Sequence, residues 1–419
     1  MLRKIKQIWK MLGPGVTTGA ADDDPSGIAT YSQTGAQFGY KFLWLAPYSF
    51  VLMGIVQEMC ARIALVTGRG LAENIRIHFS KKWLYFCGVF VILANTLNIG
   101  ADLGAMADVT QMFWSGIPFW APLIIIGITT VLLEVFVSYD EYAKYLKWLA
   151  MTLLAYIFTG VILHFDLGTV LHDTFVPTFS FTKDEILIVA AILGTTISPY
   201  LFFWQTSQEI EDEINKGQAS VELRVAEGPK AIKQMQYDVW GGMFLSNIVM
   251  FFIIAVCAST LYKAGIFEIT SARQAAEALR PLAGNLSYIL FTLGILGTGF
   301  LAIPVLAASS AYIFSETFDY KEGLYRKAND AKVFYLVIAL SVFFGLLFNF
   351  LGINPIKALV YTSVANALVA PIALVFILLL AGNKAIMGEH RNSKLGGTLG
   401  WLTTILMIGV ALATIWQLF

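Results

Sequence analysis

Charged residues are scarce in this chain. Asp, Glu, Lys and Arg together make up 13% of the 419 residues, whereas hydrophobic residues make up 57%. A soluble globular protein carries about 25% charged residues, so the composition excludes an ordinary soluble domain and predicts a membrane protein whose first partner is the lipid bilayer. The formal net charge is zero, and without an excess of basic residues we expect no nucleic-acid partner.

Cysteine and histidine are also rare. The cysteines form no CxxC pair and the histidines no HExxH motif, and these residues are Cys60, Cys87, Cys257, His78, His164, His172 and His390. These absences exclude a disulfide framework and the zinc site of a membrane metalloprotease. No nucleophile and base pair is visible either. We therefore expect neither an enzyme nor a bound cofactor.

Eleven apolar segments are long enough to cross a membrane, which takes about 20 helical residues. They lie near residues 11–36, 41–66, 84–114, 119–138, 141–164, 184–213, 237–262, 284–314, 332–351, 355–380 and 396–418. No soluble domain fits between them, so we predict an all-α membrane protein with a single transmembrane domain.

Lys and Arg are concentrated in the segments on one side, and the positive-inside rule then places the N-terminus in the cytoplasm and the C-terminus outside. We expect a bacterial inner or plasma membrane location. The oligomeric state stays open, and a monomer is compatible with the sequence.

The first apolar segment is interrupted by three consecutive carboxylates. Asp22, Asp23 and Asp24 run directly into Pro25, Ser26 and Gly27. Proline lacks an N–H and disfavours helix at the residue before it, so the helix is expected to break here. A carboxylate within a membrane is costly unless it faces a partner, an ion or a water-filled cavity. Negative charge beside freed backbone carbonyls therefore predicts a cation site.

The sixth segment carries a matching interruption, Gly194 to Tyr200, in which Pro199 again removes a donor and Thr195 and Ser198 supply hydroxyls. Two broken helices five spans apart are typical of an inverted-repeat transporter that binds its substrate near the midplane. The repeats would cover about residues 11–164 and 184–380, with an extra helix at about 396–418. The alternative is that proline and glycine only kink two helices, which membrane helices tolerate.

Polar residues elsewhere add candidates for an ion pathway. Asn95, Asn98 and Asp102 share one face of the third segment, where they line a pathway or only make hydrogen bonds between helices. Asn366 in the tenth segment either completes a site or packs a helix.

These segments resemble the NRAMP family of divalent metal transporters. The resemblance rests on Gly13-Pro14-Gly15 before Asp24-Pro25-Ser26-Gly27, on Gln57 to Arg62 with Val66-Thr67-Gly68 and Leu71-Ala72-Glu73, on Gly194 to Tyr200, and on Leu293 to Gly297 with Phe314-Ser315-Glu316. It covers nearly the whole chain and implies the leucine-transporter type of fold, with two inverted repeats of five helices. It also implies that Asp24 binds the metal and that the Thr195 carbonyl is a second ligand.

Departures from the family pattern bear on the ion. Gly27 stands where the family has a ligand asparagine, and Ser198 stands where it has a methionine thioether. Loss of sulfur leaves oxygen ligands, which suit Mg²⁺ and Mn²⁺. Tyr200 replaces a histidine, and Asn98 and Ala101 replace two acidic residues, so the groups best suited to relay a proton are missing. This pattern resembles the NRAMP-related magnesium transporters.

We therefore predict a transporter of divalent metal ions that works by alternating access, carrying a hard, partly hydrated ion, Mg²⁺ or Mn²⁺, with weak or no proton coupling. Asp24, Thr195 and Ser198 are the predicted metal site. Asp23, Gly27 and Asn366 are further candidates, and Asp22, Asn98, Asp102 and Tyr200 are candidates for the pathway. Asp22 and Asp23 could bind the ion, neutralise a hydrated one or carry a proton. The alternatives are a proton-coupled Mn²⁺ or Fe²⁺ symporter and a carrier of an organic cation or amino acid.

Overall fold

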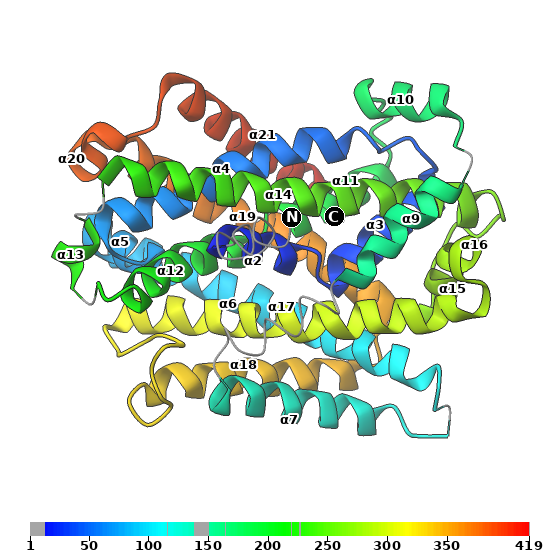
Figure 1. Cartoon of the computed structure of the whole chain (residues 1–419), viewed down its shortest axis with the longest axis horizontal. Coiled ribbons are helices and arrows are strands. Elements are labelled where there is room, and N and C mark those ends of the chain that lie inside the picture. Colours follow the sequence, from blue (N-terminus) through cyan, green and yellow to red (C-terminus); the bar gives the residue numbers. More distant parts are fainter. Residues whose placement is uncertain are drawn as a thin grey trace, which may run out of the picture.

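The computed structural model describes residues 13–114, 116–137, 151–163, 165–218, 220–225 and 228–418, and within them the chain is helical, with no strand. The helices that build the body of the bundle run alongside one another (Figure 1). They are α2 (Pro14–Asp22), α3 (Pro25–Phe38), α4 (Leu45–Thr67), α6 (Lys81–Gln111), α7 (Trp120–Phe136), α9 (Leu154–Ile162), α11 (Lys183–Thr196), α12 (Pro199–Asn215), α14 (Gly228–Cys257), α17 (Ser287–Phe318), α18 (Lys332–Phe348), α19 (Pro355–Gly382) and α21 (Lys394–Leu418).

Short helices lie at the two ends of the bundle. At the left-hand end of Figure 1 are α5 (Leu71–His78), α13 (Val221–Val225) and α20 (Lys384–Met387). At the right-hand end are α10 (Leu167–Phe175), α15 (Ala272–Ala276) and α16 (Arg280–Ala283). The first group belongs to segments predicted to be cytoplasmic and the second to segments predicted to be outside. The segments thus separate as the charge bias requires, while the orientation in the membrane stays a prediction.

Eight helices of the described part are long and apolar enough to cross a membrane. The sequence predicted eleven spans, and the three others are found as shorter pieces. The first span is divided into α2 and α3, α7 has 17 residues, and α9 is the described part of the predicted span 141–164, whose beginning lies outside the described residues. The sixth span, α11 with α12, counts as one because its two halves follow each other closely.

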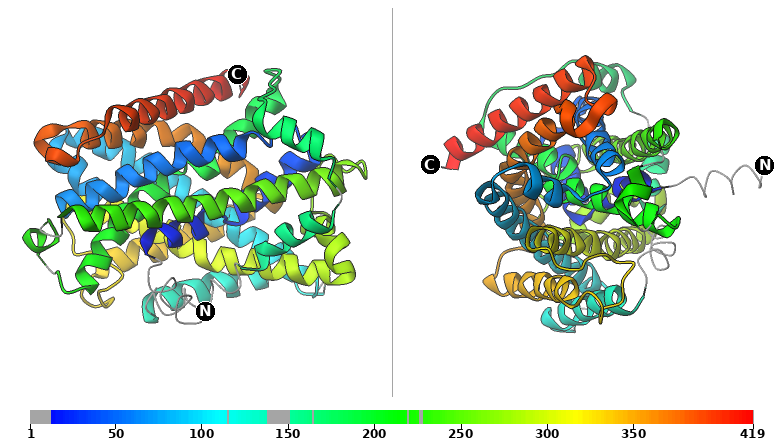
Figure 2. Two further views of the ribbon diagram at one scale, coloured as in Figure 1. Left: turned by 45° about the horizontal axis from the view of Figure 1, so that its top comes forward. Right: turned by 90° about the vertical axis from the view of Figure 1, so that its left-hand side faces the viewer.

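The two broken helices occupy the centre of the bundle. α2 and α3 pack against α14, α12 packs against α4 and α17, and α11 packs against α19. The broken helices also contact each other, because α3 packs on α11 and α2 on α12. In the turned views of Figure 2, α21 (red) lies on the outside of this core, where it packs on α19 and α11.

Glycine sets how closely the broken helices approach their neighbours. A Cβ atom added at Gly19 of α2 would lie 2.4 Å from the carbonyl oxygen of Gly242 in α14. One added at Gly194 of α11 would lie 1.9 Å from the carbonyl oxygen of Ser363 in α19. Small residues at such contacts let two backbones pack directly, which is how helices associate in a membrane. The position of each break is therefore fixed by backbone contact with an unbroken helix.

Candidate functional site

The two breaks have similar backbone geometry. At the first, Asp23 follows the end of α2 with ψ 49°, Asp24 is extended with ψ 171°, and Pro25 begins α3. At the second, Ile197 follows the end of α11 with ψ 54°, Ser198 is extended with ψ 133°, and Pro199 begins α12. Proline is well suited to the first position of a helix because that N–H has no partner within the helix. Both predicted helix breaks are confirmed.

Asp24 is fully buried and is held by three hydrogen bonds. Its Oδ1 accepts from the backbone N–H of Gly27 and from the hydroxyl of Ser26, each at 2.7 Å. Its Oδ2 accepts from the side-chain amide of Asn98 at 3.0 Å. Each carboxylate oxygen has two lone pairs, so Oδ1 is saturated by its two donors, whereas Oδ2 accepts one side-chain hydrogen bond among the described residues. Asp24 thus caps α3 and still has an acceptor site available to a cation.

Hydroxyl groups link Asp24 to the second break. The hydroxyl oxygen of Ser26 lies 3.5 Å from Oγ1 of Thr195. The hydroxyl of Ser198 lies 2.7 Å from the carbonyl oxygen of Thr195 and 2.6 Å from that of Gly194, and its single proton bonds to one of them at a time. The structure therefore brings Asp24, Thr195 and Ser198 into one buried group of oxygen atoms. Their role as metal ligands stays a prediction.

Gly27 contributes no side chain, and its neighbours fill the space beside it. A Cβ atom there would lie 3.2 Å from the carbonyl oxygen of Asp22 and 3.3 Å from both Thr195 Oγ1 and a ring carbon of Tyr31. These contacts are tight but longer than a clash. A larger side chain at Gly27 would need Tyr31 and Thr195 to move.

Asp22 and Asp23 point to a different neighbour. Both are buried, and both face Ser246 of α14, whose hydroxyl lies 2.6 Å from Asp22 Oδ2 and 3.3 Å from Asp23 Oδ1. Oδ1 of Asp22 is buried and has no hydrogen-bond partner within the described residues. The acidic run is therefore divided, with Asp24 bonded to α6 and its two predecessors to α14.

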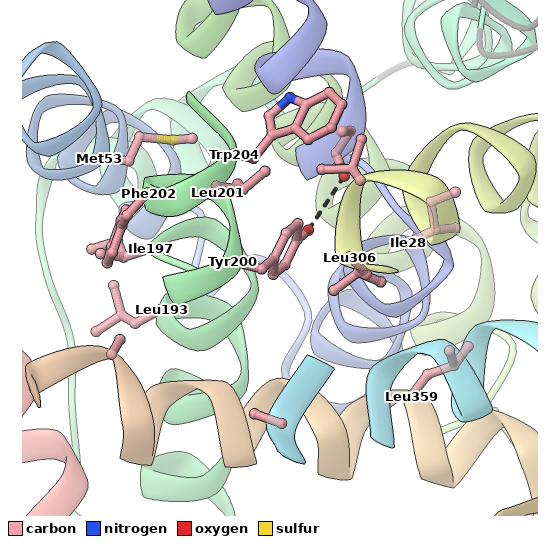
Figure 3. Packing of buried hydrophobic residues seen from close by; sticks show 14 of the residues in the cluster. Ile28, Met53, Leu193, Ile197, Tyr200, Leu201, Phe202, Trp204, Leu306 and Leu359 are labelled. Carbon is pink, nitrogen blue, oxygen red and sulfur yellow. Dashed lines mark hydrogen bonds between the residues drawn. The ribbon is translucent and has the colours of Figure 1, made fainter. Parts of the chain in front are cut away.

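The other predicted residues lie at different distances from this group. Tyr200 donates a hydrogen bond from its hydroxyl to the carbonyl oxygen of Ala21, and Figure 3 shows it among buried apolar side chains such as Leu201 and Leu306. Asp102 is fully buried, interacts electrostatically with Asp24 and is near the backbone N–H of Ser26. Tyr200 thus joins the two broken helices, and Asp102 borders the site.

Asn366 and Asn95 differ from the other candidates. Asn366 is fully buried and makes no hydrogen bond to any described residue, so the structure does not connect it to Asp24. Asn95 donates to the carbonyl oxygen of Leu306 and to the hydroxyl of Ser310, both in α17. The polar face of α6 is therefore divided, because Asn95 binds a neighbouring helix whereas Asn98 binds Asp24.

Sequence reasoning missed three residues of this region: Ser26 as a bridge, Ser246 and Tyr31. Ser26 follows Pro25, where its hydroxyl can return to the capping Asp24, and that spacing was a usable signal. Ser246 lies alone in the apolar sequence of α14, and nothing in its neighbours distinguishes it. Tyr31 is one helical turn beyond Gly27, and only the glycine reveals the space that its ring fills.

The donor set decides which ions suit this site. Within the described residues, no group of three His, Cys, Asp or Glu side chains is placed to hold a metal. The group at the breaks instead offers one carboxylate oxygen together with hydroxyl and carbonyl oxygens. Such a set suits hard cations that keep part of their water shell.

Solved structures share this fold. A manganese transporter of Eremococcus coleocola, in complex with an aromatic bis-isothiourea substituted compound, aligns with a TM-score of 0.79 at 17% identity, covering 98% of this chain and 88% of that one. The nucleobase-cation-symport-1 family transporter Mhp1 aligns with a TM-score of 0.60 at 15% identity, covering 97% and 92%. The chain therefore has the leucine-transporter type of fold, as predicted.

Sequence comparison is more specific. A divalent metal cation transporter MntH of Caldanaerobacter subterraneus subsp. tengcongensis is 27% identical over 413 residues, covering 95% of this chain and 91% of the relative. An MntH of Aeromonas hydrophila subsp. hydrophila is 26% identical over 413 residues, covering 96% and 94%. The profile described as "Natural resistance-associated macrophage protein-like" matches residues 15–417. The chain thus belongs to the NRAMP family, which consists of multi-pass membrane transporters and not of enzymes.

Proposed function

We propose that this protein carries divalent metal cations across the membrane by alternating access, with Asp24 as the charged ligand at the midplane. The observation that carries the proposal is the meeting of two helix breaks around the buried carboxylate of Asp24, whose Oδ2 accepts one side-chain hydrogen bond among the described residues. The carbonyl of Thr195 and the hydroxyl of Ser198 supply neutral oxygens from the second break. The names of the relatives, which are divalent metal and manganese transporters, support the same class of substrate.

Two cavities on opposite sides of the breaks support alternating access. A groove of about 660 Å³ at the predicted outer end is lined by α3, α11 and α19, including Gln33 and Val364. A cavity of about 240 Å³ at the predicted cytoplasmic end is lined by α12 and α17, including Glu211 and Glu316. Neither lining includes Asp24. The ion site lies between the cavities, and transport requires that each in turn opens to it.

The cytoplasmic end is closed by carboxylates that bind backbone N–H groups. Glu316 of α17 accepts from the N–H of Glu73 at 2.8 Å, close to the N-terminus of α5. Glu211 of α12 accepts from the N–H of Leu324 at 2.6 Å and from the hydroxyl of Tyr312. Glu322 lies beside these acids, and burial together with their charges raises its pKa well above the ordinary value. Release of the ion to this side requires that these contacts separate.

We propose further that the ion is hard and partly hydrated, Mg²⁺ or Mn²⁺. No sulfur atom belongs to the described hydrogen-bonded group around Asp24, and oxygen ligands do not favour soft transition metals. Uptake of Mg²⁺, Mn²⁺ and Fe²⁺ into proteoliposomes tests this. We expect saturable uptake of Mg²⁺ and Mn²⁺, and uptake of Fe²⁺ alone would contradict the proposal.

Proton-coupled transport is the second candidate, and the position of Asp102 favours it, since this fully buried carboxyl interacts electrostatically with Asp24. The same vesicles, loaded with a pH-sensitive dye, separate the two. Uncoupled transport leaves the internal pH unchanged when metal is added, whereas coupling acidifies the interior in proportion to uptake. Loss of that acidification in Asp102→Asn would assign the coupling to this residue.

A further inference from the structure

Negative charge is unevenly compensated on the two sides of the first break. Asp24 caps α3, and its charge faces three donors and the positive end of that helix's dipole. Asp22 and Asp23 lie at the C-terminal end of α2, where the dipole is negative. The charge left without compensation is therefore that of Asp22 and Asp23.

A single hydroxyl serves both of these aspartates. Ser246 lies 2.6 Å from Asp22 Oδ2 and 3.3 Å from Asp23 Oδ1, and its one proton is donated to only one of them at a time. No Lys, Arg or His of the described ranges forms an ion pair with either aspartate. Two buried carboxylates with one donor between them are costly unless a positive charge joins them.

An independent group points to the same place. Tyr31 is fully buried, its hydroxyl is near Thr195, and it interacts electrostatically with Asp22 and Asp23 as well as with Asp24. The adjacent amide of Asn247 is not available to the aspartates, because it donates to the sulfur of Met53 at 2.8 Å and to a carbonyl of its own helix at 2.9 Å. Asp22 Oδ1 thus stays without a donor within the described residues, although it is buried.

We infer that Asp22, Asp23 and Ser246 form a second cation site, separate from Asp24, which takes a small hard monovalent cation such as Na⁺. Carboxylate and hydroxyl oxygens are ligands for hard cations. The inference that this second cation is monovalent rests on the proposed function. A divalent ion at Asp24 repels a second divalent ion about twice as strongly as it repels a monovalent ion at the same distance. A cation bound there would compensate the negative charge of Asp22 and Asp23 at the C-terminal end of α2, next to the transported divalent ion at Asp24.

Thermal unfolding of the purified full-length protein in detergent tests this site. NaCl is titrated against choline chloride at constant ionic strength, without divalent ions, and ligand binding to the folded state raises the Tm saturably. We expect Na⁺ to raise the Tm where choline does not. Ser246→Ala and Asp23→Asn should each raise the half-saturating Na⁺ concentration about tenfold or more. Thr260→Ala is the matched control, because within the described residues its hydroxyl bonds to the backbone of its own helical segment.

The second arm repeats the titration with Mn²⁺ and Mg²⁺. Asp24→Asn should lose the divalent response and keep the Na⁺ response, whereas Ser246→Ala should keep the divalent response, which also shows that it is folded.

Equal effects of Na⁺ and choline, or a Tm that depends on pH but not on Na⁺, would overturn the inference in favour of a shared proton. Loss of both responses in Asp24→Asn would overturn it in favour of one site. If the wild-type protein responds to Na⁺ alone, the second site stands and the proposed divalent transport fails.

Discussion

The two helix breaks have nearly the same backbone and very different chemistry. Each has a helix end, an extended residue and a proline at the start of the next helix. The first carries three buried carboxylates, whereas the second carries Thr195 and Ser198 and no charge. The difference shows that proline determines where the helix opens, and that the side chains beside it determine what the opening binds. Charge is supplied by one break and neutral oxygen by the other.

Removal of the charge at the first break should have the largest effect. Asp24→Asn keeps an acceptor for the N–H of Gly27, so the cap of α3 is preserved while the negative charge is lost. We expect divalent uptake into proteoliposomes to fall by at least about 100-fold, because the loss of one partner from a buried charged pair costs about 3–5 kcal/mol. The matched change at the second break, Ser198→Ala, removes only a neutral oxygen and should reduce uptake much less. Equal losses in both variants would remove the distinction between the breaks.

Substitution of a glycine near each break tests how tightly the two breaks are packed. Gly194→Ala puts a Cβ 1.9 Å from a carbonyl oxygen of α19, and such overpacking should lower the free energy of unfolding by about 1–3 kcal/mol. Gly27→Ala meets no atom closer than 3.2 Å and should change it by less than about 1 kcal/mol. Thermal unfolding of both variants measures the difference. A Gly194→Ala protein as stable as the wild type would show that α11 is not fixed against α19 as the structure has it.

A thioether at the second break should change ion preference more than total activity. Ser198→Met adds a soft ligand beside Thr195, and we expect Cd²⁺ to compete with Mn²⁺ about tenfold better than in the wild-type protein. Mg²⁺ uptake should fall in the same variant, because magnesium does not favour sulfur. Thr206→Met is the control, because Thr206 lies on α12, the helix that follows Ser198, and its hydroxyl bonds to the backbone of that helix. Unchanged Cd²⁺ competition would place Ser198 outside the ion site.

The hydroxyl that joins the two breaks should have a smaller effect. Ser26→Ala removes a hydrogen bond of 2.7 Å to Asp24 and the link to Thr195, while the backbone cap from Gly27 remains. A net hydrogen bond contributes about 1 kcal/mol, so the apparent affinity for the ion should weaken about fivefold. Initial uptake rates over a range of Mn²⁺ concentrations provide the measurement. A change in maximal rate without a change in KM would mean that Ser26 affects the motion and not the binding.

The smallest effect concerns Glu322 and the acids around it, which lie near the C-terminal end of α12 and away from its break. Burial and the charges of Glu316, Glu73 and Glu211 raise the pKa of Glu322. A raised pKa means that the folded state holds the proton more firmly, so Glu322 lowers stability as the pH rises from its ordinary value through the raised one. Glu322→Gln should flatten this decline, with a shift in Tm of less than about 2 °C at pH 7.5. A steeper decline in the variant would contradict the assigned sign.

Local features of the fold were predictable because their causes are local. Pro25 and Pro199 remove a backbone donor wherever they stand, so both breaks could be placed before any contact was known. The apolar spans followed from length and composition, and the family resemblance gave the fold that the solved structures share. The candidate site was predicted in part, since Asp24, Thr195 and Ser198 are brought together, whereas Asn366 is not connected to them.

Partners across helices could not be read from the sequence, because they depend on how each helix is rotated and how closely it approaches its neighbour. Periodicity placed Asn95 and Asn98 on one face of α6, yet one binds α17 and the other binds Asp24. The role of Ser246 could not be predicted, because a single hydroxyl in an apolar helix becomes recognisable as part of a site only when the residues that face it are known. The sequence by itself determined where two helices open and that the first opening is acidic. The tertiary structure decided which carboxylate turns to the second opening and which two turn away, because backbone contacts at glycines set the position of α2 and α11 against their neighbours.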